Sequence, residues 1–183
     1  MIAWQDILNY SDLLASQSEV EKSLHALVEI LNDHYYDKNP IVVCLMNGGL
    51  FFTSQLCQLL RFPLRIDYMH ATRYRDKMSG EDLQWVKSPQ FNLANEHVLL
   101  IDDIFDEGIT LKEVTEKLLL DKPASLESVV LIEKVHCRKP DDFSVKYVGM
   151  RLEDRYLYGM GMDYLGHWRH LPHIYAVQNG EKK

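Results

Sequence analysis

The residues with the clearest chemical potential lie in one run, Val98–Leu111, whose sequence is VLLIDDIFDEGITL. Its four leading apolar residues predict a short strand buried on both faces, and Asp102 and Asp103 stand where that strand is expected to end. A tight turn and the start of a helix are then predicted by the next residues, Asp106, Glu107, Gly108, Ile109 and Thr110. The N–H groups of such a turn converge, and the helix dipole adds about half a positive charge, so the arrangement is typical of a phosphate site.

The two adjacent acids indicate what accompanies the phosphate. Carboxylates suit sugar hydroxyls and Mg²⁺ better than they suit bare phosphate oxygens. The run has no Gly-Lys-Ser/Thr sequence that could form a Walker loop, which argues against a nucleoside triphosphate. We therefore interpret the run as a site for a phosphorylated sugar with a metal nearby, against the alternative of an ordinary turn with solvated acids.

A second stretch near the end of the chain could hold a flat ring. Aromatic residues, small residues and one acid alternate in Tyr156–Tyr164 (YLYGMGMDY), and Trp168–Pro172 (WRHLP) follows. Such a pattern suits a planar ligand lying over a tight backbone. A cluster of tyrosine and methionine is also typical of a hydrophobic core, so this signal is weak by itself.

Composition bounds the class of protein. The chain has 183 residues, a formal net charge of −7 and 46% hydrophobic residues, as expected for one domain rather than for a general nucleic-acid or membrane-surface binder. No apolar run approaches the ~20 residues of a membrane span, and the first residues lack a secretory pattern. The three cysteines are widely spaced, which favours buried thiols and a cytoplasmic location.

Hydrophobic periodicity predicts successive strand–helix units. Strands are expected at 41–46, 64–69, 98–103 and 128–134, and helices at 50–60 and 110–120. Ser18–Glu21 has the form of a capping box, and a helical stripe continues from it to Tyr35. Residues 1–17 show only a loosely helical spacing. The order of elements predicts an α/β fold with a mainly parallel sheet and helices on both faces.

These features together resemble a known family. The run 98–111 resembles the 5-phosphoribosyl-1-pyrophosphate (PRPP) motif of the type I phosphoribosyltransferases, and 159–172 (GMGMDYLGHWRHLP) resembles the tail of the hypoxanthine-guanine branch. The resemblance implies a mainly parallel twisted sheet flanked by helices, in a single domain 1–183 with a core at about 37–150. A small hood from about 1–17 and 151–183 is implied as well. So are a Mg²⁺ cofactor, PRPP and a 6-oxopurine as substrates, no nucleic-acid or membrane partner, and a homodimer or homotetramer.

The resemblance also implies roles for individual residues. The turn 106–110 would bind the 5′-phosphate of PRPP, and Asp106 would be the general base near the purine N7. Ribose hydroxyls and Mg²⁺ would be held by Asp102 and Asp103, with Asp163 helping to hold a second Mg²⁺. The purine would contact Lys134 at its 6-oxo group, with the rest of its contacts from Tyr156, Leu157 and Asp163. Pyrophosphate would contact Asn47, Gly48 and Arg169, and a lid in the polar segment 71–89 would contain Arg73 and Tyr74.

Four residues depart from the family pattern, namely Asn47, Arg73, Asp102 and Glu107. Asn47 stands where a cationic residue is usual, and Glu107 stands where a hydroxyl residue is usual. A carboxylate facing a phosphate repels it, so the side chain of Glu107 is expected to point away from the site. These departures leave two alternatives open: a relative that prefers xanthine or guanine, or a regulator with the same fold that senses PRPP or a nucleotide.

Overall fold

The computed structural model describes residues 2–73 and 83–178. Its helices and strands follow in this order: η1 (Ile7–Tyr10), β1 (Ser11–Ala15), α1 (Gln17–Tyr35), β2 (Ile41–Met46), α2 (Gly49–Leu59), β3 (Arg65–Arg73), β4 (Leu83–Lys87), β5 (His97–Phe105), α3 (Ile109–Leu119), β6 (Ser125–Val135), β7 (Tyr147–Glu153), β8 (Leu157–Tyr158) and β9 (Ile174–Val177). None of the helices in this part of the chain is both long and apolar enough to cross a membrane.

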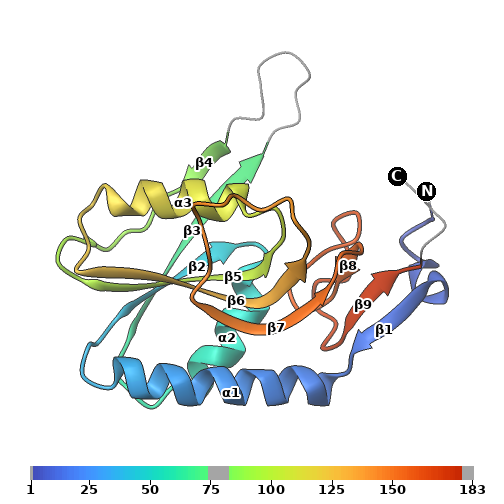
Figure 1. The fold of residues 1–183 in the computed structure, drawn as a ribbon, viewed down its shortest axis with the longest axis horizontal. Helices are drawn as coiled ribbons and strands as arrows, with labels where there is room; N and C mark the ends of the chain where they lie inside the picture. Colours follow the sequence, from blue (N-terminus) through green and yellow to red (C-terminus); the bar gives the residue numbers. More distant parts are fainter. Residues whose placement is uncertain (1, 74–82, 179–183) are drawn as a thin grey trace.

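The central element is a six-stranded sheet with the strand order β4-β3-β2-β5-β6-β7. Its strands are parallel except for β4, which pairs antiparallel with β3. Helices α1 and α2 cover one face of the sheet and α3 covers the other (Figure 1). The predicted α/β class, with a mainly parallel sheet between helices, is confirmed.

Helices bury both faces of the sheet, and side chains alternate along each strand, so successive residues are buried on opposite faces. Val42 and Leu99 pack in the cluster that contains the apolar residues of α1 and α2, whereas their neighbours Val43 and Leu100 pack in the cluster that contains those of α3. The four residues are fully buried. Burial on both faces explains why 98–101 is a continuous apolar run. It also holds the carboxyl end of β5 in a fixed position within the packed core.

A second sheet is built from both ends of the chain. It has the order β1-β9-β8 and is antiparallel, and it lies beside the carboxyl ends of the central strands (Figure 1). The guanidinium of Arg155 ties these strands together, since it bonds to the Asp12 carboxylate in β1 and to the carbonyl of Val177 in β9. We call this three-stranded sheet, together with the loop 159–173 that joins β8 to β9, the hood.

Several local predictions were wrong. The capping box is formed by Ser16 and Glu19 rather than within Ser18–Glu21, because α1 begins at Gln17, directly after β1. The stretch before α1, whose spacing was ambiguous, contains a 3₁₀ turn and a strand. Strand β5 continues two residues past Asp103 to Phe105, so the acids lie within the strand rather than at its end.

The polar segment 71–89 also differs from the expected loop. Strand β3 extends into it as far as Arg73 and pairs with β4, so most of its described part is a β-hairpin. The predicted lid residue Tyr74 lies outside the described residues. The backbone of Arg73 belongs to β3 and pairs with Leu83.

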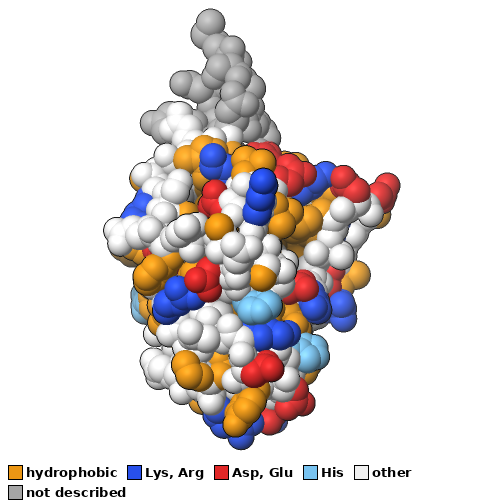
Figure 2. Space-filling model, turned by 90° about the vertical axis from the view of Figure 1, so that its left-hand side faces the viewer, with side chains coloured by type: hydrophobic (Ala, Val, Ile, Leu, Met, Phe, Trp, Pro, Cys, Tyr) orange, Lys and Arg blue, Asp and Glu red, His pale blue; other side chains and the backbone are white. Residues whose placement is uncertain are grey.

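Figure 2 shows the face of the molecule at the left of Figure 1, which is away from the hood. Blue and red side chains are interspersed with orange ones on this face, and the visible described surface has no broad single-sign area.

Candidate active site

The turn after β5 has the geometry that the sequence predicts for an anion site. Gly108 is the residue that precedes α3, and its φ of 78° lies in the left-handed region. A Cβ atom at this position would lie 2.3 Å from the ring of Phe105, so glycine is required on both conformational and steric grounds. Helix α3 then begins at Ile109, and Thr110 lies in its first turn. The N–H groups at the start of an α-helix are directed out of its N-terminus, and α3 begins three residues after Asp106.

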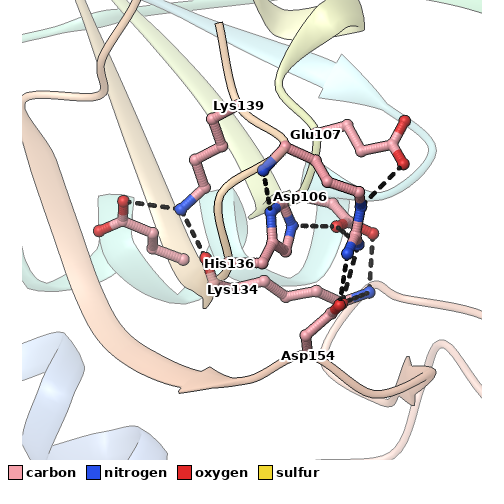
Figure 3. Close-up of polar contacts among 8 residues, drawn as sticks. Asp106, Glu107, Lys134, His136, Lys139 and Asp154 are labelled. Carbon is pink, nitrogen blue, oxygen red and sulfur yellow. Dashed lines mark hydrogen bonds and ion pairs between the residues drawn. The ribbon is translucent and has the colours of Figure 1, made fainter. Parts of the chain in front are cut away.

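Asp106 is held by two cationic or polar donors. The Nζ atom of Lys134, on β6, lies 2.7 Å from Oδ2 of Asp106, and Nε2 of His136 lies 2.8 Å from Oδ1 (Figure 3). Partial burial acts to raise the pKa of Asp106, but the hydrogen bonds from Lys134 and His136 outweigh it and the pKa is lowered. Asp106 is therefore a stabilised carboxylate in this structure.

Lys134 is itself nearly buried, with a side chain 10% exposed. Besides Asp106 it has a second acid, Asp154, at 3.8 Å. Two carboxylate neighbours compensate the charge of the buried ammonium group. The ammonium group can therefore exchange one carboxylate for a ligand oxygen and still keep the other. The structure places Lys134 near the carboxyl end of β6, within hydrogen-bond distance of Asp106 in the turn after β5.

Arg138 closes the network on its outer side. Its guanidinium makes two hydrogen bonds to the carboxylate of Asp154, at 2.7 and 3.1 Å, and a longer one of 3.3 Å to Oε1 of Glu107. The hydrogen bond from Arg138 also lowers the pKa of Asp154. The carboxylate of Glu107 is therefore partly neutralised by Arg138, which is how the chain accommodates an acid in the phosphate turn.

Sequence reasoning missed His136 and Arg138 as members of the site. No sequence pattern marked them, because they lie in the bend after β6 and not on one face of a strand. Asp154 belonged to the resembling stretch but carried no predicted role. Ligand atoms of Asp106, His136 and Asp154 approach within 4.8 Å of one another, but Lys134 and Arg138 already supply the positive charge there, so we assign no metal to them.

A second group of predicted residues meets on the other side of Asp103. A Cβ on Gly48 would lie 2.4 Å from Oδ2 of Asp103, and a Cβ on Gly161 would lie 2.0 Å from the carbonyl oxygen of Gly48. Three segments therefore touch here: the loop after β2, strand β5 and the hood. The Arg169 side chain donates to the carbonyl of Gly161, and it forms an ion pair of 2.6 Å with Asp163.

The acid pair of β5 is electrostatically strained. Burial, and then the neighbouring carboxylate of Asp103, raise the pKa of Asp102 well above its usual range. Burial likewise raises the pKa of Asp103, although its hydrogen bond with Asp102 and the guanidinium of Arg169 act in the opposite direction. Two adjacent covered carboxylates whose pKa values are both raised by burial make an oxygen donor set that fits a hard divalent cation such as Mg²⁺.

The remaining predicted residues lie in or beside the hood and in the loop after β2. Tyr156 is partly exposed and packs edge-to-face against Tyr164, with ring centroids 5.6 Å apart. Leu157 is buried in β8, where it pairs with Ala176 of β9. Asn47 is exposed in the loop between β2 and α2, and the peptide bond that precedes it is cis. Asp163 accepts a hydrogen bond of 2.7 Å from the N–H of Gly166 and so belongs to the Arg169 pair rather than to the acids of β5.

Fold and site together define an α/β protein with a glycine-containing turn at a helix N-terminus and an acid pair at the carboxyl edge of a mainly parallel sheet, with a hood beside it. A family model described as the phosphoribosyl transferase domain matches residues 9–157. The chain belongs to the phosphoribosyltransferase family, as its sequence resemblance predicts.

Similar proteins support this assignment over most of the chain. The chain is 34% identical over 162 residues to the hypoxanthine-guanine-xanthine phosphoribosyltransferase of Tritrichomonas foetus, covering 88% of each protein. It is 31% identical to the hypoxanthine-guanine phosphoribosyltransferase of Aquifex aeolicus (strain VF5), covering 91% of this chain and 94% of that protein. The solved structure of a hypoxanthine phosphoribosyltransferase from Staphylococcus aureus is similar with a TM-score of 0.87, at 31% identity, covering 93% and 94% of the two chains.

Proposed function

We propose that this protein is a purine-salvage enzyme, which transfers the 5-phosphoribosyl group of PRPP to N9 of hypoxanthine or guanine and releases pyrophosphate. The proposal is supported by the names of its relatives. The observation that carries it is the pairing of Lys134 with Asp106 directly beside the phosphate turn. A donor for a 6-oxo group and a candidate base are thereby next to the site where the ribose phosphate would lie.

In this mechanism the turn 106–110 binds the 5′-phosphate through its N–H groups and the dipole of α3. The ribose hydroxyls donate to Asp102 and Asp103. The covered carboxylates position the sugar so that its C1′ atom lies in line between pyrophosphate and the purine nitrogen. When bound, one Mg²⁺ would be held on the side of Asp102 and Asp103 and a second with the help of Asp163, and the ions would neutralise charge on the pyrophosphate.

Lys134 and Asp106 recognise the base together. The ammonium of Lys134 donates to the purine 6-oxo oxygen, and the released Oδ2 of Asp106 then accepts a proton from N7, which keeps N9 nucleophilic. Adenine presents an amino group at the same position, so two donors would face each other and a buried charge would lose its partner. Selectivity for 6-oxopurines therefore comes from hydrogen bonding rather than from size.

The other predicted residues complete the substrate site. Tyr156 stacks on the purine ring, and the backbone of Leu157, together with Asp163, contacts the base edge. Asn47, Gly48 and Arg169 bind pyrophosphate. The segment with Arg73 and Tyr74 closes over the site and excludes water, which would otherwise hydrolyse PRPP.

A pyrophosphate-release assay tests the proposal. Purified protein with PRPP, Mg²⁺ and either hypoxanthine or guanine is expected to release pyrophosphate continuously, whereas adenine and a reaction without base serve as controls. Absence of turnover with every 6-oxopurine would refute the assignment.

Xanthine is a further candidate base, because one relative is named for it. If the contacts at the purine 2-position tolerate an oxo group, xanthine will be turned over at a rate comparable to guanine. Comparison of kcat/KM for hypoxanthine, guanine and xanthine decides the order of preference.

We further propose that residues 1–183 act as one cytoplasmic domain, with a core at about 37–150 and a hood from about 1–17 and 151–183, and that the chain forms a homodimer or a homotetramer. A hollow of about 630 Å³ is lined by α2, β2 and β3. The exposed apolar side chains Leu50, Ile66 and Tyr68 surround it, which favours a second copy as the partner. Light scattering on the wild type and on Ile66→Glu tests this, and a monomeric wild type would contradict it.

A further inference from the structure

His136 is a buried titratable residue to which the proposed mechanism gives no role. Its side chain is 5% exposed, and it lies just after β6, two positions beyond Lys134. Its Nε2 atom is 2.8 Å from Oδ1 of Asp106 (Figure 3). A histidine buried against the candidate base requires an account of its hydrogen bonds.

The backbone fixes the tautomer of this ring. The N–H of Arg138 lies 3.2 Å from Nδ1 of His136. A backbone amide can only donate, so Nδ1 carries a lone pair and the ring hydrogen is on Nε2. His136 is therefore a neutral imidazole that donates from Nε2 to Asp106. The side chain of Arg138 is anchored by Asp154, which holds the donating amide in place.

The carboxylate of Asp106 is divided between its two donors. Lys134 occupies Oδ2 and His136 occupies Oδ1. Lys134 has a long, flexible side chain and a second acid, Asp154, at 3.8 Å, so it can leave Oδ2 for a ligand. His136 has a short, rigid side chain fixed at both nitrogens, so it stays on Oδ1.

We propose that His136 is a positioning residue, which holds Asp106 by Oδ1 so that Oδ2 alone faces the purine once Lys134 moves to the 6-oxo group. This role rests on the proposed function. Without the Nε2 donor, the carboxylate can rotate about its Cβ–Cγ bond, and the base atom is no longer set in place. A misplacement of about 1 Å at a reacting group lowers a rate by about 100-fold.

Two substitutions at this position separate positioning from packing. His136→Phe keeps the volume but removes the donor, whereas His136→Gln keeps an N–H near the place of Nε2. We expect kcat to fall by about 10- to 100-fold in His136→Phe, with KM for PRPP and guanine within about 3-fold of wild type, and His136→Gln to retain most of kcat. Wild-type kcat in His136→Phe, or equal losses in both variants, would overturn the proposal.

A matched control is available at His97, which bonds to Ser125 at the opposite end of the sheet. Strand β5 separates it from the site by about 25 Å at the usual rise per residue. His97→Phe is expected to leave kcat within about 3-fold of wild type. If kcat falls as much in His97→Phe as in His136→Phe, the loss is not specific to the contact with Asp106, and the proposal is overturned.

A spectroscopic measurement tests the geometry without turnover. In ¹⁵N-histidine-labelled protein, Nε2 of His136 is expected to give the signal of a protonated ring nitrogen and Nδ1 that of an unprotonated one. The carboxyl signal of Asp106 should titrate at a higher pH in His136→Phe than in the wild type, since one donor is gone. The opposite tautomer or an unchanged Asp106 titration would overturn the role. If instead the wild type fails to release pyrophosphate, the proposed function falls while this measurement still reports on His136.

Discussion

Gly161 is the point at which the hood touches the core, and its replacement by alanine tests whether that contact sets the site. Its φ of 107° lies in a region that residues with a Cβ rarely adopt. An added Cβ would lie 2.0 Å from the carbonyl oxygen of Gly48 and 3.2 Å from Cβ of Asp103. The first of these neighbours is backbone, so it cannot move aside by a change of side-chain rotamer.

The size of the effect follows from these distances. Real Cβ atoms essentially never come within 3.0 Å of another group, so a contact at 2.0 Å forces Gly161 and Gly48 apart by at least about 1 Å. Gly48 and Asp103 are proposed to bind pyrophosphate and the ribose. A displacement of that size at a reacting centre lowers the rate by about 100-fold, and we expect kcat/KM for PRPP in Gly161→Ala to fall by about that factor.

Gly166 provides a matched control in the same segment. Its φ is 81°, but a Cβ there would meet nothing within 4 Å. Gly166→Ala therefore adds backbone strain of about 1–2 kcal/mol without a clash. Its Tm should fall by about 2–8 °C, because 1 kcal/mol corresponds to about 2–4 °C in a chain of this size. Its kcat/KM should stay within about 3-fold of wild type.

Steady-state kinetics with varied PRPP and a thermal unfolding scan on the three proteins complete the experiment. Gly161→Ala is expected to lose activity well beyond Gly166→Ala, even at a temperature where both are folded. If the two variants have the same kcat/KM, the contact between hood and core does not set the substrate geometry, and this reasoning is wrong.

Three further outcomes are expected at the Asp106 network. Asp106→Asn should lower kcat by about 10²–10⁴-fold while purine binding measured by calorimetry is largely kept, and a near-normal kcat would remove Asp106 as the base. Lys134→Gln should narrow the preference for guanine over adenine in kcat/KM, and an unchanged ratio would mean that another group reads the 6-position. Because the folded-state pKa of Asp106 is lowered from its ordinary 3.8, its ion pair stabilises the fold above that pH and is lost as pH falls through the lowered value. Acid unfolding between about pH 2 and pH 5 should therefore be shallower in Lys134→Gln, and identical curves would contradict this.

The sheet and the phosphate turn were predictable because their signals are local. A strand buried on both faces must be continuously apolar, and a left-handed turn residue packed against Phe105 must be glycine. The structure of 98–111 can therefore be predicted from its own residues. The hood strands have no such signal. Strand β1 has only one buried residue, Ala15, and it is a strand because β9 lies beside it.

The start of α1 shows why a correct pattern can still give the wrong boundary. Ser16 and Ser18 are each followed three positions later by glutamate, so two capping boxes were compatible with the sequence. Ser16 is used because β1 ends at Ala15 and the chain must turn at once into the helix. This choice depends on the pairing of β1 with β9 and therefore on a distant part of the chain.

The site residues divide in the same way. Asp102, Asp103 and Asp106 belong to a motif whose order carries the chemistry, so their place could be foreseen. His136 and Arg138 follow β6, and nothing in their own segment specifies that they meet the turn after β5. Their contact with Asp106 and Glu107 arises because β5 and β6 are parallel neighbours in register, a tertiary property that periodicity alone does not give.

The pairing of β1 with β9 also determines at what stage of synthesis the chain can complete its fold. Ser11–Ala15 leave the ribosome long before Ile174–Val177, so β1 stays unpaired while the residues between the two strands are synthesised. The six-stranded sheet can assemble meanwhile, since β7 ends at Glu153. In stalled nascent chains the six-stranded sheet should therefore become resistant to protease before the hood does. A chain truncated before Ile174 should fold its central sheet but have no enzymatic activity.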